Sequence, residues 1–148
     1  MYKSILIATD GSKYAKKAGQ HAIELANLMS SNITVLSVIE NVYLQTITAD
    51  DLIEKMEDAM KKEGKENLDN FVKQLEINQC QGTCKNINLK SELKIGNPAE
   101  TILNTIEEEN IDLLIVGNSG KHGLDRFLLG SVAEKVIRSA KCPVLVVR

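Results

Sequence analysis

The sequence predicts an α/β protein whose mainly parallel sheet is covered by helices on both faces. Short apolar runs alternate with helical patterns along the chain, from the run at 3–9 to the run at 144–147. The first run is almost continuously apolar, as strands buried on both faces are, and the helical segments repeat apolar residues at three- and four-residue spacing. Strand–helix–strand order places successive strands in parallel. Ligands of such sheets bind beyond the carboxyl ends of the strands.

The composition limits the size and the class of the protein. The 148 residues suit one domain over 1–148 with one core. Hydrophobic residues make up 43% of the chain but aromatic residues only 3%, so we expect an aliphatic core. A net charge of −2 gives no general attraction to nucleic acid or to an anionic membrane. The chain starts on a strand-like run without a signal-peptide pattern, and no apolar run approaches the roughly 20 residues of a membrane span, so we expect a cytoplasmic protein.

The first half of the chain is expected to contain two strands and two helices. The strand over 3–9 ends at Asp10-Gly11-Ser12, where Ser12 is a candidate N-cap. The helix that follows has a face of mostly small residues, namely Ala15, Ala18, Ala22, Leu25, Ala26 and Met29. Residues 32–39 form a β-branched second strand and 40–49 a loop. A long helix over 49–77 carries two apolar stripes, the first including Leu52, with Gly64 between them as an expected bend.

The second half is expected to contain three strands and two helices. The strand over 86–95 is apolar at odd positions, which predicts one exposed side or a place at the edge of the sheet. Asn97 and Pro98 begin a helix as N-cap and first helical residue. A buried strand over 112–116 and a helix over 131–140, with Val132, Val136 and Ile137 turned inward, precede a last strand, Val144–Val147.

A glycine-rich segment after the fourth strand is the candidate binding element. Gly117 and Gly120 follow the strand, and Gly130 precedes Ser131 at a helix N-terminus. Glycines let the backbone approach a ligand closely, and a helix N-terminus offers free N–H groups to phosphate. Three strand ends meet at this edge: Thr9-Asp10, Val38-Ile39 and Val116-Gly117. Asp10 can accept hydrogen bonds from a ribose, and the peptide around Val38 can face a base.

Simpler interpretations stand beside this one. The glycines can be turn residues, and Asp10 can cap the first helix, although both roles of Asp10 can coexist. His122 is a candidate base or a solvated loop histidine, and Lys121 and Arg126 either supply positive potential or are exposed cations. Cys80 and Cys84 are either a metal or redox pair or, like Cys142, free thiols. Neither a G-x-x-x-x-G-K-[ST] loop nor a G-x-G-x-x-G motif after the first strand is present.

The glycine spacing resembles the G-2x-G-9x-G-[ST] pattern of the universal stress protein family. The segments 5–12, 96–102, 128–136 and 142–147 resemble that family as well, and the resemblance covers the whole chain, most weakly over 40–92. It implies a Rossmann-like fold of the adenine nucleotide alpha hydrolase-like class, with a five-stranded parallel sheet of order 3-2-1-4-5. It also implies an ATP site, with Mg²⁺ or Mn²⁺ favoured by the phosphates.

The resemblance assigns a role to each matching residue. Asp10, preceded by Thr9, and Gly117 would hold the ribose, and Val38 would contact adenine through its backbone. The phosphates would be held by the remaining site residues, which are Gly120, Gly130, Ser131 and Val132. The family divides into members that bind ATP and members that lack the glycine pattern, and this chain resembles the first group.

In that strand order, Val144–Val147 lies at an apolar, uncharged sheet edge, so we expect a homodimer that pairs these strands.

The first functional hypothesis is an ATP-binding regulatory or stress-response protein without a dedicated catalytic site, because no positioned base or metal-ligand cluster is evident. The alternatives are a weak ATPase and a nucleotide-independent module that binds a partner through the helix over 49–77.

Overall fold

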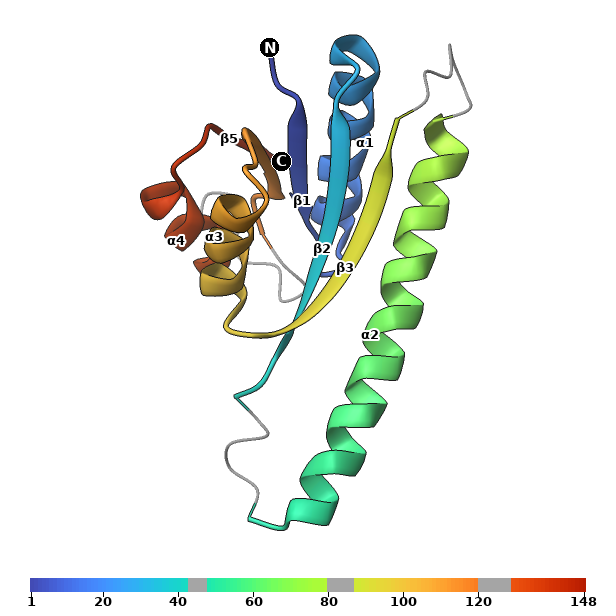
Figure 1. The fold of residues 1–148 in the computed structure, drawn as a ribbon, viewed down its shortest axis with the longest axis vertical. Helices are drawn as coiled ribbons and strands as arrows, with labels where there is room; N and C mark the ends of the chain where they lie inside the picture. Colours follow the sequence, from blue (N-terminus) through green and yellow to red (C-terminus); the bar gives the residue numbers. More distant parts are fainter. Residues whose placement is uncertain (43–47, 80–86, 120–128) are drawn as a thin grey trace.

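The computed structural model describes residues 1–42, 48–79, 87–119 and 129–148. Strands and helices alternate along the chain (Figure 1). In chain order the elements are β1 (Ser4–Ala8), α1 (Lys13–Met29), β2 (Asn32–Glu40), α2 (Asp50–Gln79), β3 (Leu89–Gly96), α3 (Pro98–Glu108), β4 (Leu113–Gly117), α4 (Ser131–Ser139) and β5 (Val144–Val147). The predicted order of elements is therefore confirmed.

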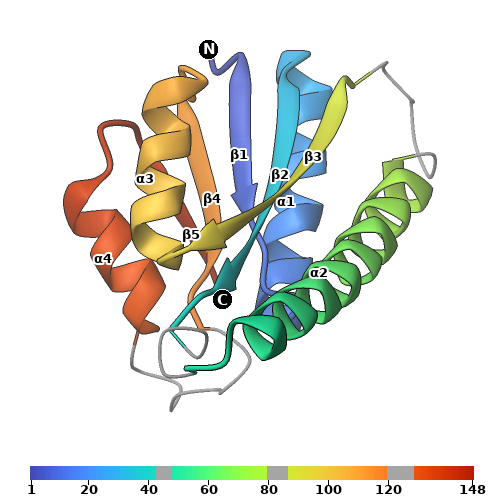
Figure 2. The ribbon, with the colours of Figure 1, turned by 60° about the horizontal axis from the view of Figure 1, so that its bottom comes forward.

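The five strands form one parallel sheet of order β3-β2-β1-β4-β5, which confirms the predicted topology. Helices α1 and α2 cover one face of the sheet and α3 and α4 cover the other (Figure 2). Alternate residues of β1 therefore enter different cores: Ile5 and Ile7 pack toward α1, and Leu6 packs toward α3. This double burial explains why β1 is apolar at consecutive positions.

Two predicted helix starts are confirmed in atomic detail. The Ser12 hydroxyl accepts a hydrogen bond from the Ala15 N–H at 3.2 Å and caps α1. The Asn97 side chain accepts from the Glu100 N–H at 3.2 Å and caps α3, with Pro98 at its first turn. Both caps lie at the edge of the sheet where the strands end, so they fix the chain beside the candidate site.

Helix α2 shows a role for Gly64 that the sequence did not reveal. It is one uninterrupted helix from Asp50 to Gln79, and Gly64 within it is a contact residue. A Cβ atom there would lie 3.0 Å from Cδ1 of Ile39 and 3.2 Å from Cδ1 of Leu93, so glycine lets the helix backbone rest on β2 and β3. The N-terminal half of α2 extends beyond the sheet (Figure 1), and Leu52 of the first predicted apolar stripe is 49% exposed.

Ile137 of α4 is a further correction. It was expected to face inward but is 38% exposed, whereas Val136 beside it is fully buried. Ala133 and Val136 are the buried residues of α4, and Val132 packs partly buried against the same core, whereas Ile137 lies outside this face of the helix. Within the described residues, no helix is both long and apolar enough to cross a membrane.

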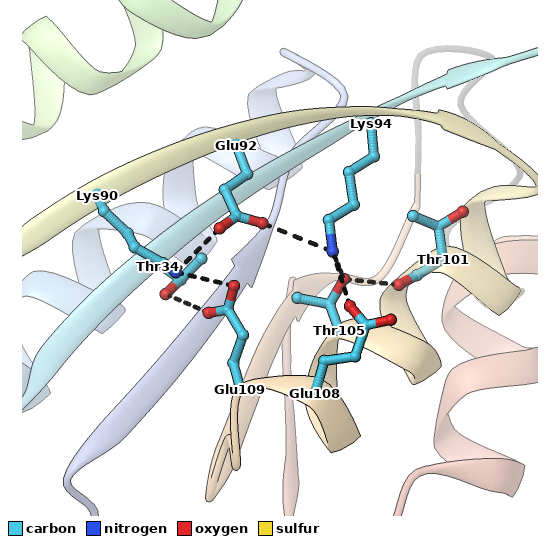
Figure 3. A network of polar contacts seen from close by, with 8 residues as sticks. All are labelled: Thr34, Lys90, Glu92, Lys94, Thr101, Thr105, Glu108 and Glu109. Carbon is cyan, nitrogen blue, oxygen red and sulfur yellow. Dashed lines mark hydrogen bonds and ion pairs between the residues drawn. The ribbon is translucent and has the colours of Figure 1, made fainter.

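The polar face of β3 is occupied by a charged cluster that joins this strand to α3 (Figure 3). Its members are Thr34, Lys90, Glu92, Lys94, Thr105, Glu108 and Glu109. Lys90 Nζ lies 2.8 Å from Glu109 Oε1 and 2.9 Å from Glu92 Oε1. Lys94 Nζ donates to the buried Thr105 hydroxyl at 2.9 Å. The even positions of β3 are therefore polar because they meet charged groups of α3, and β3 is an edge strand as predicted.

The charged cluster makes a prediction for acid stability. Burial alone would raise the pKa of Glu92, but hydrogen bonds with Lys90 and Glu109 hold it below its ordinary value of 4.5. Such a group stabilises the fold above its unfolded-state pKa, and this stabilisation is lost as the pH falls through the lowered value. Glu92→Gln should therefore flatten the fall in the free energy of unfolding below pH 4.5.

Because the Glu92 side chain is 26% exposed, we expect this difference to stay below about 1 kcal/mol. Urea denaturation at a series of pH values measures it. Glu108→Gln is the matched control, since Glu108 contacts Lys94 from a more exposed position. Parallel pH profiles for the wild type and Glu92→Gln would contradict the assignment.

Candidate functional site

A cavity of about 490 Å³ opens at the carboxyl ends of the strands. Its volume lies within the range of about 300–1,000 Å³ that is usual for small-molecule sites. The described residues that the sequence assigned to the site all line it: Thr9, Asp10, Val38, Gly117, Gly130, Ser131 and Val132. Gly120 lies outside the described residues. The structure thus brings together three strand ends and one helix start that are distant in sequence.

The backbone of Val38 is turned toward the cavity by the alternation of β2. The Leu36 carbonyl accepts from the Thr9 N–H at 2.9 Å, on the side of β1, whereas the Ile33 N–H donates at 2.8 Å to Asn88, on the side of β3. Backbone groups two residues apart in a strand point to the same side. The N–H and C=O of Val38 therefore point toward β1, at a level where β1 has already ended.

Asp10 anchors the turn between β1 and α1. Its Oδ1 accepts from the Ser12 N–H at 2.9 Å, and the Thr9 hydroxyl accepts from the Gly11 N–H at 3.1 Å. Gly11 has a φ of +78°, which glycine adopts without strain. Because Ser12 is the N-cap of α1, Asp10 does not cap this helix but fixes the preceding turn, and this structural role holds its carboxylate at the wall of the cavity.

The N-terminus of α4 faces the same cavity. Gly130 is its N-cap and has no side chain to occupy the first N–H groups of the helix, which belong to residues of the cavity wall. The Gly130 N–H donates to the Asn118 carbonyl at 2.8 Å, and the Asn118 N–H donates to Val147 at 2.8 Å. Asn118 therefore connects the end of β4 to β5 and positions the start of α4.

Gly117 has a packing role that the sequence motif did not reveal. A Cβ atom at this position would lie 2.7 Å from Cβ and 2.8 Å from the carbonyl carbon of Tyr14. The first turn of α1 therefore rests directly on the backbone at the end of β4. This contact alone requires glycine, so the identity of this residue does not by itself indicate a ligand.

Sequence reasoning missed the part of the cavity wall that comes from α2. Met60, Glu63 and Asn67 line the cavity together with Gly64. These residues lie in the segment where the family resemblance is weakest, and no motif marks them. The signal that could have located them is Gly64, because a glycine in the middle of a long amphipathic helix indicates close approach of another chain segment.

Acidic side chains dominate the charge of the described cavity wall. Among the described lining residues, Asp10, Glu40 and Glu63 are charged and none is basic. The described ranges contain no group of three or more His, Cys, Asp or Glu residues that could hold a metal ion. Lys121, His122 and Arg126 lie outside the described residues, as do Cys80 and Cys84. Cys142 is a free thiol whose pKa is raised by burial.

The fold and the cavity together define a class of protein. In a doubly wound parallel sheet, ligands bind at the strand ends where the order of strands reverses. Here β2 and β4 leave the central β1 in opposite directions, and the cavity touches the ends of all three strands. The chain is therefore an α/β protein with a small-molecule cavity at its topological switch point.

Comparison with known proteins identifies the family. Residues 1–148 match the model of the universal stress protein family, and the chain belongs to this family. It is 36% identical over 148 residues to universal stress protein MJ0531 of Methanocaldococcus jannaschii, covering 100% of this chain and 83% of that protein. The structure of the hypothetical protein MJ0577 superimposes with a TM-score of 0.85 at 32% identity, covering 99% of this chain and 96% of that one.

A more distant structure of the same family contains a nucleotide. The universal stress protein from Archaeoglobus fulgidus in complex with dAMP has a TM-score of 0.67 and 23% identity to this chain. The match covers 99% of this chain and 98% of that one. At this level of identity the likeness shows the shared fold alone.

Proposed function

We propose that this protein binds ATP in the cavity and acts as a nucleotide-responsive regulatory protein of the stress response. The observation that carries the proposal is the convergence of the Val38 backbone, the Asp10 carboxylate and the open N-terminus of α4 on one cavity. These groups are those that a base, a ribose and phosphates need. The nucleotide in the Archaeoglobus structure is consistent with the proposal, but the argument rests on the residues of this chain.

Adenine fits the base end of the cavity. The Val38 backbone offers one donor and one acceptor beyond the end of β1. The Watson–Crick edge of adenine has the complementary pair, because N1 accepts and the 6-amino group donates. Guanine presents a donor at N1 and an acceptor at O6, so the same backbone pair disfavours it.

The phosphates belong at the other end, against α4. The helix N-terminus has a partial positive charge and first N–H groups that no described side chain caps, and both features favour an anion. Because the described wall is acidic, we expect Mg²⁺ or Mn²⁺ to accompany ATP and to offset the phosphate charge. Among the described residues, we expect Asp10, Gly130 and Ser131 to lie closest to such a complex.

Analysis of the small molecules released when the purified protein is denatured tests the proposal. We expect an adenine nucleotide, and we expect ATP added to the nucleotide-free protein to raise its melting temperature, since ligand bound only to the folded state stabilises it. Recovery of no nucleotide together with no thermal shift would reject the proposal.

The proposal assigns binding rather than turnover to the site. Phosphate release well above the background rate, and sensitive to Asp10→Ala or His122→Ala, would favour the weak ATPase instead. Recovery of one partner protein regardless of added ATP, and dependent on the exposed face of α2, would favour the nucleotide-independent module.

We further propose a homodimer that pairs β5 with its copy. The two sheet edges differ: β3 carries Lys90, Glu92 and Lys94, whereas Val144–Val147 is apolar and uncharged. Charged residues protect an edge strand from pairing, and a bare apolar edge invites it. Leu145 on this edge is 36% exposed. A two-fold pairing would cover both copies at once.

Leu145→Lys should convert the dimer into a monomer, because it places a charge at the centre of each paired edge. Light scattering at micromolar concentration should then give the mass of one chain instead of two. Leu52→Lys is the control, since Leu52 is also exposed but lies on α2, away from this edge. A monomeric wild type, or a dimer that tolerates Leu145→Lys, would contradict the proposed interface.

A further inference from the structure

The α2 wall of the cavity, formed by Met60, Glu63 and Asn67, lies beside the part of β2 assigned to the base. Gly64 fixes this arrangement, because its backbone packs against the side chain of Ile39, the residue after Val38. The helix therefore brings side chains to the cavity wall next to the part of β2 that is assigned to the base. These side chains are candidates for a second contact to the base.

Glu63 and Asn67 are available for such a contact. They are four residues apart on α2 and so lie on neighbouring turns of one helix face. Within the described part of the chain, neither side chain has a hydrogen bond or ion pair. Elsewhere on this helix, Glu57 is paired with Lys61 at 3.0 Å. Glu63 and Asn67 are thus exposed polar residues of the cavity wall that have no partner among the described residues.

We infer that α2 recognises the Hoogsteen edge of the bound base, with Glu63 accepting from the 6-amino group and Asn67 donating to N7. The inference rests on the proposed nucleotide function, in which Val38 takes the Watson–Crick edge. The 6-amino group has a second hydrogen and N7 is an acceptor, so both remain for the α2 wall beside β2. A carboxylate only accepts, so Glu63 favours a 6-amino purine and repels a 6-oxo purine.

The test compares three nucleotides that share one triphosphate. ATP, ITP and 7-deaza-ATP, each with Mg²⁺, have the same charge, whereas ITP lacks the 6-amino group and 7-deaza-ATP lacks N7. Titration calorimetry on the full chain gives the three dissociation constants for the wild type, Glu63→Gln and Asn67→Ala. Glu66→Gln is the matched control, because Glu66 is on the same helix but does not line the cavity.

Each variant should lose one kind of discrimination. Glu63→Gln should reduce the preference for ATP over ITP by about 5- to 20-fold, because an amide can donate to the 6-oxo group. Asn67→Ala should keep that preference but reduce the preference for ATP over 7-deaza-ATP by about 3- to 10-fold. Glu66→Gln should change neither ratio.

The outcomes separate the inference from the function on which it rests. If the wild type binds ATP but both ratios are unchanged in both variants, the α2 contact is wrong and the nucleotide site stands. If the folded wild type binds none of the three nucleotides, both are wrong. All four proteins should have the same circular dichroism spectrum and closely similar melting temperatures without nucleotide, because the three substitutions are on the exposed side of α2.

Discussion

Gly130→Asp should weaken ATP binding by about 100-fold, because it places a negative charge at the helix start that faces the phosphates. The same substitution should leave the nucleotide-free protein unchanged or stabilise it by about 0.5 kcal/mol, since aspartate is a favourable N-cap and Gly130 provides no side-chain cap. Gly130 has φ −63° and ψ 152°, a conformation open to any residue, so no backbone strain opposes the change. Because the ATP affinity should fall while the free energy of unfolding stays the same or rises, the experiment distinguishes loss of the binding site from loss of the fold.

Gly130→Asn is the matched control for this effect. Asparagine caps a helix about as well as aspartate but carries no charge. We expect a much smaller loss of affinity, with the same or higher stability, by calorimetric titration and urea denaturation. Equal losses for the two variants would show that side-chain volume and not charge matters, and unchanged affinity in Gly130→Asp would place the phosphates elsewhere.

Gly117→Ala should lower the free energy of unfolding by about 2–3 kcal/mol. The new Cβ atom would meet the backbone carbonyl carbon of Tyr14 at 2.8 Å, and neither β4, which is paired with β1 and β5, nor the first turn of α1 can move away cheaply. Urea denaturation without nucleotide measures the change. A loss of stability in the absence of any ligand would show that the packing contact is sufficient to require this glycine.

Gly19→Ala provides the comparison. A Cβ atom there would come equally close, at 2.7 Å to Cδ2 of Leu75 and 3.1 Å to Cζ of Phe71, but both are the outer ends of side chains and not backbone. Alanine also favours the interior of α1 by about 1 kcal/mol. The change at Gly19 should therefore cost less than about 1 kcal/mol. Equal costs at Gly117 and Gly19 would contradict the distinction between backbone and side-chain contacts.

Local signals in the sequence were sufficient for the elements and their order along the chain, whereas the order of the strands in the sheet was implied only by the family resemblance. Continuous apolar runs marked strands buried on both faces, and the caps at Ser12 and Asn97 marked two helix starts. Such signals depend on residues that are close in sequence, so they can be interpreted without knowledge of the tertiary structure. The exposed Leu52 and Ile137 could not be predicted in this way, because whether an apolar helix position is covered depends on how far the sheet extends beneath it.

The candidate site was predictable where residues lie at strand ends or at the glycine-marked start of α4. Thr9, Asp10, Val38 and Gly117 reach one edge of the sheet because parallel strands end there together. The contribution of α2 depends instead on the rotation and the slide of a 30-residue helix over the sheet. The sequence between β2 and β3 has no motif that specifies this register, and Gly64 was therefore interpreted as a bend and not as a contact.

Calorimetric titration of the nucleotide-free wild-type protein with ATP and Mg²⁺ tests the central claim most directly. The proposed site predicts saturable binding with one ATP per chain, abolished or strongly weakened in Gly130→Asp. A folded protein that gives no saturable heat and no thermal shift with ATP, with either Mg²⁺ or Mn²⁺, would contradict it.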